Sequence, residues 1–367
     1  MLRILRHASS RAGKPPTTRA ELPSLGSAPI RAIWEQDSAD AYVVGARFLK
    51  TPKTVSIVGA PMSWGQPQPG TDMGPQLVRT AGLNKALKRL GWRIHSDSDL
   101  GVDSPTSEDE NADQKYMKAT GELAHNASSV GKFLHKLATA TEQSARRDEF
   151  VLTIGGDHSV GCGSVAGILK ARPDTGVIWV DAHGDLQTPQ TTETGNMHGM
   201  PVGLLMSSVE ERMKIPGFSW MNDDYPVLDP SRIVFVGARD LDQAERRIIK
   251  QKQIKCFTMT DVDRWGIGVV MDLAIKHLGA SCPLHLSYDV DAVDAQFAPH
   301  TGTVVRGGFS YREANYITES IAETNRLCSM DLVEINPNLG PITSPLENET
   351  VQLGLALVAS AMGQRLL

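Results

Sequence analysis

Four short polar clusters in the sequence carry residue types that can bind metal ions or transfer protons. Each cluster directly follows an apolar run that predicts a buried strand. The clusters are Gly155-Gly156-Asp157-His158-Ser159, Asp181-Ala182-His183-Gly184-Asp185, Asp289-Val290-Asp291 followed by Asp294, and Glu334-Ile335-Asn336. In open α/β sheets, ligands bind beyond the carboxyl ends of the strands, so we expect the four clusters to converge on one site.

The spacing within two clusters points to metal binding. Asp181, His183 and Asp185 are two residues apart, as are Asp289 and Asp291, so in an extended segment each set points to one side. Carboxylates gathered in this way repel one another and are costly to bury unless a cation neutralises them. A set of carboxylates with one or two imidazoles is typical of Mn²⁺ or other hard to borderline ions, whereas a zinc site of the thiolate type would need cysteines. Such a set can hold two ions, and two ions can activate a water as hydroxide.

Each cluster also has a structural interpretation. A single Asp-x-Asp is usually a turn or a cap. Asp157 or Ser159 could likewise cap a helix that follows the first cluster. Three such clusters at predicted strand ends nevertheless favour a metal site, and Glu334 on a buried strand has no evident structural purpose.

The elements that position these clusters alternate between strands and helices. Strands are expected at 55–58, 151–154, 177–180, 233–236, 256–257, 284–288 and 330–335, and helices at 75–90, 114–147, 159–170, 243–251, 268–278, 311–325 and 349–362, with a loop over 99–114. Short continuous apolar runs are typical of strands that are covered on both faces. The sequence therefore predicts an α/β fold class, a three-layer α/β/α arrangement with a mostly parallel central sheet.

The composition excludes several classes of protein. The chain has 367 residues, of which 41% are hydrophobic, so it can bury a large core. Its formal net charge of −5 argues against general binding of nucleic acids or anionic membranes. No apolar run approaches the roughly 20 residues that span a bilayer. The 4 cysteines lie far apart in the sequence, which indicates reduced thiols rather than a disulfide framework.

The first fifty residues differ in composition from the rest. Residues 1–20 include Arg3, Arg6, Arg11, Lys14 and Arg19 but no acidic residue. This composition predicts a transit peptide and a mitochondrial (matrix) location, with a disordered tail on a cytoplasmic protein as the alternative. We therefore divide the chain into an N-terminal extension, 1–50, which ends in a linker and a short helix at 39–48, and a catalytic domain, 51–367.

Several stretches of the chain resemble the ureohydrolase family. They are GAPMSWGQPQPGTDMGP (59–75), GGDHSVGCGS (155–164), DAHGDLQTPQTTETGNMHGMP (181–201), SYDVDAVDAQFAPHTGT (287–303), GGFSYREANYIT (307–318) and MDLVEINP (330–337). Three of them match the metal-binding signatures of the whole family. The segment 187–201 and the run GTVVRGGFSYRE are similar to arginases rather than to agmatinases. The resemblance implies an arginase-like fold and two Mn²⁺ ions per subunit.

The resemblance also implies roles for individual residues. The metal ligands would be His158, Asp181, His183, Asp185, Asp289 and Asp291. Asp185 would also pass a proton from the hydroxide to the leaving amine. Glu334 would pair with the substrate guanidinium, and His198 would shuttle protons between the site and solvent.

Seven further residues are implied to bind the substrate. Those near its α-carboxylate would be Gln187, Thr192, Thr194 and Asn196. Asp242 would bind the α-ammonium with support from Glu245, and Thr303 would orient groups near Glu334. Asp242 could instead be the N-cap of the following helix, and the two threonines could be plain loop residues.

The chain departs from the arginase pattern at the predicted substrate loop. Gln187 stands where Asn is usual, and Thr194 where Ser is usual. The extra methylene of Gln187 would shift its amide by roughly 1.5 Å and change how the α-carboxylate is bound. The run Tyr311-Arg312-Glu313 matches a stretch that joins subunits in arginase trimers, so a homotrimer is expected.

The implied activity is hydrolysis of L-arginine to L-ornithine and urea by a hydroxide that bridges two Mn²⁺ ions. One alternative is a ureohydrolase for another guanidino compound, such as agmatine or guanidinobutyrate. The other is a catalytically silent metal-binding homologue. The implied activity is chemically reasonable, because a carboxylate can hold the planar, charged guanidinium in position for attack by the hydroxide.

Overall fold

A computed structural model describes residues 49, 53–339, 344 and 346–365, and its centre is one β-sheet. The strands are β1 (Thr54–Ala60), β2 (Arg93–Asp99), β3 (Phe150–Gly155), β4 (Gly176–Val180), β5 (Ile233–Ala238), β6 (Lys255–Thr258), β7 (Leu284–Asp289) and β8 (Leu327–Val333). They form an 8-stranded sheet in the order β2-β1-β3-β8-β7-β4-β5-β6. Every neighbouring pair is parallel, which confirms and sharpens the predicted mostly parallel sheet.

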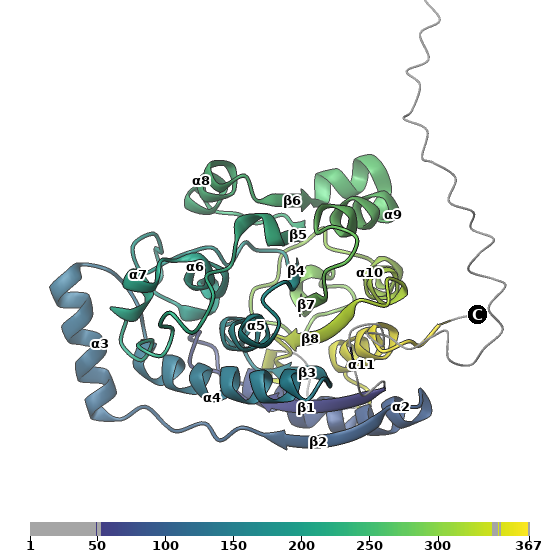
Figure 1. The fold of residues 1–367 in the computed structure, drawn as a ribbon, viewed down its shortest axis with the longest axis horizontal. Helices are drawn as coiled ribbons and strands as arrows, with labels where there is room; N and C mark the ends of the chain where they lie inside the picture. Colours follow the sequence, from purple (N-terminus) through teal and green to yellow (C-terminus); the bar gives the residue numbers. More distant parts are fainter. Residues whose placement is uncertain (1–48, 50–52, 340–343, 345, 366–367) are drawn as a thin grey trace, which may run out of the picture. The chain divides into compact units, whose positions relative to one another are not determined.

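Helices cover both faces of this sheet (Figure 1). They are α1 (Gly74–Thr80), α2 (Leu83–Arg89), α3 (Ser107–Thr120), α4 (Ala127–Arg146), α5 (Val160–Ala171), α6 (Pro201–Met206), α7 (Val209–Met213), α8 (Gln243–Lys252), α9 (Met259–His277), α10 (Tyr311–Glu323) and α11 (Glu349–Ala361). Helices α1, α2, α9, α10 and α11 enclose one hydrophobic core with the sheet, and α4, α5 and α6 enclose the other. The predicted three-layer α/β/α arrangement is therefore confirmed.

The order of the strands brings the polar clusters together. The strands β3, β8, β7 and β4, which precede the four clusters, are the central four of the sheet. Because all four run in the same direction, their carboxyl ends lie side by side at one edge. Residues from 155 to 336 thereby reach one site, as expected from the sequence.

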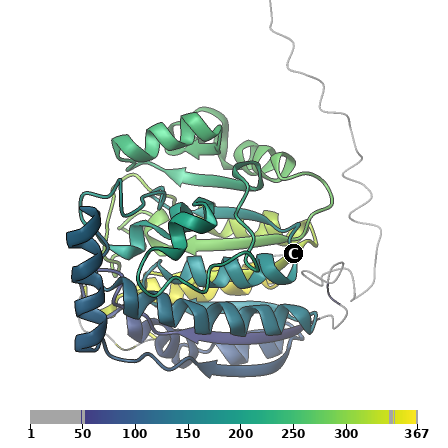
Figure 2. The ribbon, with the colours of Figure 1, turned by 60° about the vertical axis from the view of Figure 1, so that its left-hand side comes forward.

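Two of the predicted helices were wrong because glycines interrupt them. The expected helix at 75–90 is two helices, α1 and α2, separated at Gly82, whose φ of 116° ends the first helix. The expected helix at 114–147 is also two, and Gly121, with φ 76°, ends α3 before α4 begins. Figure 2 shows α3 running across the direction of α4 rather than continuing it. A single glycine in an apolar periodic pattern is a weak sign of a break.

The other differences concern exposed or short elements. The expected loop at 99–114 contains the start of α3, whose N-cap Thr106 forms a capping box with Asp109. Strand β2 was not predicted, because it is an edge strand in which no residue is fully buried. The short helices α6 and α7 were also missed. Helix α9 is kinked at Gly266, where φ is 79° and ψ 153°, so the expected helix from 268 is its second segment and the segment before Gly266 was missed. The remaining strands and helices are confirmed with small changes in their ends.

The N-terminal predictions lie outside the described residues. These are the transit peptide, the linker and the short helix at 39–48. Among the described residues, no helix is both long enough and apolar enough to cross a membrane.

Candidate functional site

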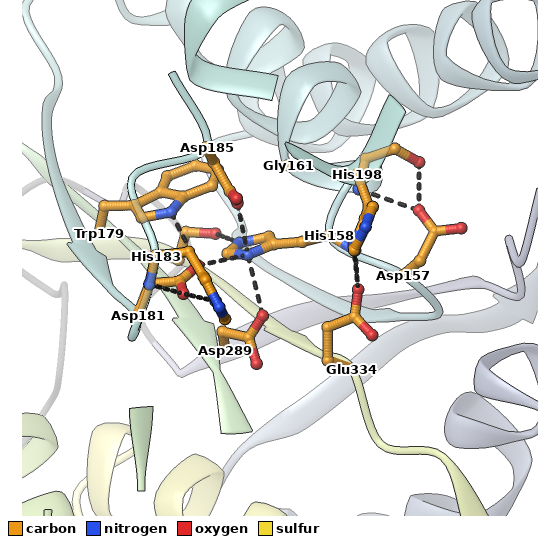
Figure 3. Close-up of polar contacts among 12 residues, drawn as sticks. Asp157, His158, Gly161, Trp179, Asp181, His183, Asp185, His198, Asp289 and Glu334 are labelled. Carbon is orange, nitrogen blue, oxygen red and sulfur yellow. Dashed lines mark hydrogen bonds and ion pairs between the residues drawn. The ribbon is translucent and has the colours of Figure 1, made fainter. Parts of the chain in front are cut away.

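A buried histidine is the centre of the first group of candidate metal ligands (Figure 3). The Nδ1 atom of His158 lies 2.9 Å from an oxygen of Asp181, 3.0 Å from one of Asp185 and 3.2 Å from one of Asp289. His158 follows β3, Asp181 and Asp185 follow β4, and Asp289 ends β7. Ligand atoms of His158, Asp181 and Asp185 are close enough together to hold one ion.

A second group of ligands lies beside the first and shares a carboxylate with it. The Nδ1 atom of His183 lies 3.3 Å from Oδ1 of Asp181 and 3.1 Å from Oδ2 of Asp291. These three residues also place their ligand atoms together as a metal site would. Asp181 faces His158 with Oδ2 and His183 with Oδ1, so its two oxygens point to two adjacent positions. The structure thus brings all six predicted ligands together.

The contacts inside the first group are those expected of atoms that share a cation. His158 Nδ1 and Asp185 Oδ2 are 3.0 Å apart, yet both are buried without a hydrogen-bond partner among the described residues. Orphaned polar atoms of this kind are costly in a protein interior. A divalent ion bound between them would satisfy both atoms at once. The donor set of imidazole and carboxylate is also one that such ions accept.

Burial and crowding shift the pKa values of the ligand carboxyls in the absence of metal. Burial raises the pKa of Asp185 to about 6, and the neighbouring charge of Asp181 adds to this rise. Burial also raises the pKa of Asp289 well above its ordinary value, with help from Asp291. Burial acts in the same direction on Asp181, but His158 and His183 outweigh it and hold that pKa below its ordinary range. The same carboxylates raise the pKa of His158 well above its ordinary value despite its burial, so without metal the two histidines supply the positive charge that a cation would bring.

Local packing fixes the His158 ring. The ring stacks on the indole of Trp179, with centroids 4.2 Å apart and planes 11° from parallel. The same indole donates a hydrogen bond of 3.2 Å from Nε1 to Asp181. At the start of α5, Gly161 lies so close that an added Cβ would be 2.6 Å from the Trp179 ring. Glycine is needed there because any side chain would displace the ring that supports His158.

Two carboxylates of the site have left-handed backbone conformations. Asp185 has φ 51° and Glu334 has φ 65°. Non-glycine residues adopt this region at an energetic cost, and such residues cluster at active sites. At both positions the chain turns sharply after its strand, which directs the side chain back toward the ligand groups.

Glu334 is held beside the ligand groups by donors from two remote segments. Its Oε1 accepts a 2.8 Å hydrogen bond from the backbone N–H of His158, and its Oε2 accepts one of 2.8 Å from Gln66 Nε2. The His198 ring lies on the same carboxylate, with Nδ1 3.5 Å from Oε1. Burial lowers the pKa of His198, but the contact with Glu334 and nearby acidic groups outweigh this effect, so the net pKa is raised. Glu334 and His198 are thus neighbours at the place where sequence reasoning expected them.

Asp157 fixes the backbone of two segments next to Glu334 and His158. It is fully buried and accepts hydrogen bonds from the backbone N–H groups of Gly65 and Ser159, at 2.8 and 3.0 Å. Burial raises its pKa to about 6, and the charge of Glu334 raises it further. The capping interpretation was wrong, because Ser159 is the N-cap of α5 and no side chain caps the helix; Asp157 instead fixes the turn before α5 and belongs to neither ligand group.

A cavity of about 270 Å³ opens over the ligand groups. Its walls include five of the seven predicted substrate-binding residues, which are Gln187, Thr194, Asn196, Glu245 and Thr303. His198 and the metal-ligand candidates His158, His183, Asp185 and Asp289 also line it. The cavity therefore joins the guanidinium end of the proposed site to the loop expected to bind the α-carboxylate.

The other two predicted substrate residues do not line this cavity. Thr192 is nearly buried, and its hydroxyl accepts hydrogen bonds from the backbone N–H groups of Thr194 and Gly195, so it holds the loop in shape. Asp242 is the N-cap of α8 and forms a capping box with Glu245. The capping alternative is thus confirmed for Asp242. Its second oxygen accepts a 2.6 Å hydrogen bond from Gln187 Nε2, which connects it to the cavity wall.

Thr303 and Glu245 have specific partners that the sequence did not indicate. The Thr303 hydroxyl donates to Oδ2 of Asp291 at 2.9 Å, so it contacts a metal-ligand candidate rather than Glu334. Glu245 accepts from the backbone N–H of Leu186 at 3.2 Å, and burial raises its pKa to about 7. Both residues therefore fix the cavity walls.

Gln66, Trp179 and Ser287 also support the site, although no sequence pattern indicates a role for them. Gln66 holds Glu334, Trp179 supports His158, and the Ser287 hydroxyl lies 2.9 Å from His158 Nε2. All three lie within or next to the stretches that resemble the family, which was the available signal. Their roles depend on pairings between distant segments, which no local pattern reveals.

Comparison with known proteins identifies the family. The model of the arginase family matches residues 53–363. An arginase from Glaciozyma antarctica is 43% identical over 327 residues, which cover 87% of this chain and 90% of that protein. Arginase-1 of Rattus norvegicus is 41% identical over 318 residues, 86% of this chain and 94% of the relative.

Solved structures agree with the sequence comparisons. The structure of arginase from Bacillus caldovelox has a TM-score of 0.76 and 36% identity, and the match covers 86% of this chain and 99% of that one. Arginase from Bacillus subtilis has a TM-score of 0.74 and 33% identity, with 86% and 100% covered. On the family match and on identities above 40% across most of both sequences, the chain belongs to the arginase family.

Proposed function

We propose that this member of the arginase family hydrolyses L-arginine to L-ornithine and urea with two Mn²⁺ ions. One observation carries the proposal. Asp181 is shared by two groups of metal-ligand atoms, and Glu334 is fixed beside them in the same site. This arrangement offers two adjacent cation positions and a separate carboxylate for a guanidinium. Relatives named arginase, about 40% identical over most of their length, support the same activity.

The ligand candidates of the site would hold the two ions in two groups. His158, Asp181, Asp185 and Asp289 would hold one ion, and His183, Asp181 and Asp291 would hold the other. When bound, the ions supply a hydroxide nucleophile at neutral pH and neutralise the crowded carboxylates. The imidazole and carboxylate donors suit Mn²⁺.

Glu334 is suited to orient the guanidinium. Its carboxylate is buried and held by the backbone of His158 and the amide of Gln66, so it presents a fixed negative charge. A guanidinium is planar and always charged, and a carboxylate fixes both its plane and its position. Orientation of this kind brings the central carbon toward the nucleophile.

Asp185 and His198 are suited to move the proton that the reaction requires. Asp185 lines the cavity and would accept a proton from the attacking water and transfer it to the leaving nitrogen. His198 lies against Glu334 at the cavity wall, with a side chain 18% exposed, so it connects the site with solvent. An imidazole titrates near physiological pH and can return the proton in each cycle.

The distal end of the cavity supports an amino acid as substrate. Gln187, Thr194 and Asn196 supply amide and hydroxyl groups for an α-carboxylate, and Asp242 lies behind Gln187 with a negative charge for an α-ammonium. A buried polar group that is left without a partner costs free energy. These side chains therefore disfavour a substrate that lacks an α-carboxylate and an α-ammonium group.

The test is urea release by the Mn²⁺-loaded protein from L-arginine and from agmatine, with a chelated control. We expect metal-dependent urea from L-arginine and little from agmatine. Faster turnover of agmatine would contradict the assignment of the distal loop while keeping the metal chemistry. Absence of urea from both substrates would overturn the proposed activity.

We also propose that the chain forms a homotrimer. Val269 and Leu273 are exposed four residues apart on α9, Trp265 is exposed just before the kink of α9 at Gly266, and Tyr316 is exposed on the neighbouring α10. Tyr311, in the run that resembles subunit contacts of arginases, is 46% exposed at the start of α10. A second copy of the chain would cover this apolar surface. Light scattering should give three times the chain mass, and Trp265→Lys should lower it.

A mitochondrial location is our remaining proposal. It rests on the basic, acid-free composition of residues 1–20, which lie outside the described part of the chain. Residues 1–50 fused to a fluorescent protein should direct it to mitochondria, and a diffuse cytoplasmic signal would favour the alternative.

A further inference from the structure

A chain of buried polar side chains runs from the metal-ligand candidate His158 into the middle of the sheet. His158 Nε2 lies 2.9 Å from the hydroxyl of Ser287 on β7. Oδ2 of Asp331 on β8 lies 3.5 Å from that hydroxyl and 3.0 Å from Nε2 of His285. The Nδ1 atom of His285 lies 2.9 Å from the hydroxyl of Ser329. All five residues are at most 1% exposed.

The donors and acceptors in this chain have a defined direction. Asp331 Oδ2 accepts hydrogen bonds from Ser287 and, at 2.5 Å, from the Ser164 hydroxyl of α5. Because Ser287 donates its single proton to Asp331, its oxygen is left as an acceptor for His158. His158 must then carry its proton on Nε2, which leaves the lone pair of Nδ1 free. That is the nitrogen that faces Asp181, Asp185 and Asp289.

Stability alone does not account for this network. Its members lie on the face of the sheet where the neighbouring strands bury apolar side chains, such as Val151 opposite Ser329 and Val177 opposite His285. A buried ionic pair is often no better for stability than apolar residues of the same size. One oxygen of Asp331 even lacks a partner among the described residues. A role in positioning a metal ligand explains why polar groups stand there.

We propose that Ser287, backed by Asp331 and His285, positions His158 for its metal ion. The three residues fix the tautomer and the orientation of the imidazole ring. They also make the lone pair of Nδ1 a stronger metal ligand. The effect is confined to the ion of the His158 group. His183 is held differently, with a side chain 25% exposed and contacts to Asp181 and Asp291, so its ion does not depend on the network. The proposal rests on the two-ion centre of the proposed function.

The experiment measures stepwise metal affinity rather than turnover. The full-length protein is stripped of metal and titrated with Co²⁺ in competition with a chelator, while the visible absorption of the bound cobalt is recorded. His158→Ala and His183→Ala assign each binding step to its group. Ser287→Ala should weaken the His158 step by about 10–100-fold and leave the His183 step unchanged. Asp331→Asn should weaken the same step and change the cobalt spectrum.

Ser129→Ala is the matched control. Ser129 is a buried residue on α4 rather than on the sheet, and its hydroxyl has no partner among the described residues. It should bind both ions like the parent protein. Ser287→Thr keeps a hydroxyl and should recover most of the lost affinity. Thermal unfolding of the metal-free forms shows that each variant is folded, and Asp331→Asn carries the test where Ser287→Ala does not fold.

Three outcomes separate this proposal from the function on which it rests. Equal affinity of Ser287→Ala and the parent at the His158 step would overturn the positioning role. An equal loss at both steps would also overturn it, because it would indicate a general structural defect. A parent protein that binds fewer than two ions would instead overturn the two-ion centre itself.

Discussion

The side-chain amide of Gln187 is tied to Asp242, with Nε2 2.6 Å from Oδ2 of the carboxylate. The other oxygen of Asp242 accepts from the backbone N–H of Glu245 at the start of α8. A residue of the cavity wall is therefore fixed to the N-terminus of a helix. The longer side chain of Gln187, compared with the usual Asn, is what spans this distance.

This connection makes Gln187 a determinant of substrate preference. Gln187→Ala should raise the KM for L-arginine about tenfold, which corresponds to the loss of about one hydrogen bond to a charged group. The kcat should change less than twofold, because the amide lies away from the guanidinium end of the cavity. Steady-state kinetics on L-arginine and agmatine measure both effects. A fall in kcat as large as the change in KM would contradict this assignment.

Two substitutions of Asp242 distinguish its role in substrate binding from its role as the N-cap of α8. Asp242→Asn keeps a capping side chain but removes the charge, so it should raise the KM for L-arginine while leaving stability nearly unchanged. Asp242→Ala should in addition lower the free energy of unfolding by about 1 kcal/mol. Urea denaturation of both variants distinguishes the two contributions. Equal stability of the two variants would argue against the cap.

Glu334 should be essential for turnover. Glu334→Gln removes the negative charge and places an amide N–H₂ toward Gln66 or toward the backbone N–H of His158. We expect kcat/KM for L-arginine to fall by about 10²–10³-fold, the usual cost of losing one partner of a buried charge pair. Metal content is the control and should stay at the parent value. Activity above a tenth of the parent level would exclude the proposed role.

Metal binding should stabilise the fold. Without cations the carboxyls of the site are buried and also repel one another, and burial together with these neighbouring charges raises the pKa values of Asp185 and Asp289. An ion at 100 times its Kd contributes about 2.7 kcal/mol per site, so Mn²⁺ should raise the Tm by several degrees. Differential scanning fluorimetry measures this. Asp181→Asn, which alters both groups, should abolish the rise, and a rise that persists in it would place the ions elsewhere.

Gly161 provides a test of packing behind His158. Gly161→Ala would bring a methyl group to 2.6 Å from the ring of Trp179, so the ring must shift. The free energy of unfolding should fall by about 1–3 kcal/mol, as for other overpacked cores. Gly101→Ala is the matched control, because nothing lies within 4 Å of its Cβ position. Chemical denaturation that gives the same stability for both variants would show that the Trp179 ring moves freely.

The sequence was sufficient to predict the layers and the metal-ligand candidates. Apolar runs such as Val177 to Val180 locate buried strands, and the polar clusters that follow them converge because the strands are parallel. It was insufficient at three kinds of place. The edge strand β2 has no continuous apolar run, Gly82 and Gly121 break helices whose apolar pattern continues, and the bond between Gln66 and Glu334 joins residues 268 positions apart. Local patterns contain no information on such distant pairs.

The place of β8 in the sheet determines how much of the chain must be present before the site is complete. It is the last strand to leave the ribosome, yet it lies between β3 and β7. Without β8 the strand order falls into two groups, β2-β1-β3 and β7-β4-β5-β6, and His158 follows a strand of the first group while His183 follows a strand of the second. Closing contacts so distant in sequence is slow. The His158 group of ligand candidates, which combines residues after β3, β4 and β7, needs β8 between β3 and β7, so it is complete only in a chain that extends past residue 333.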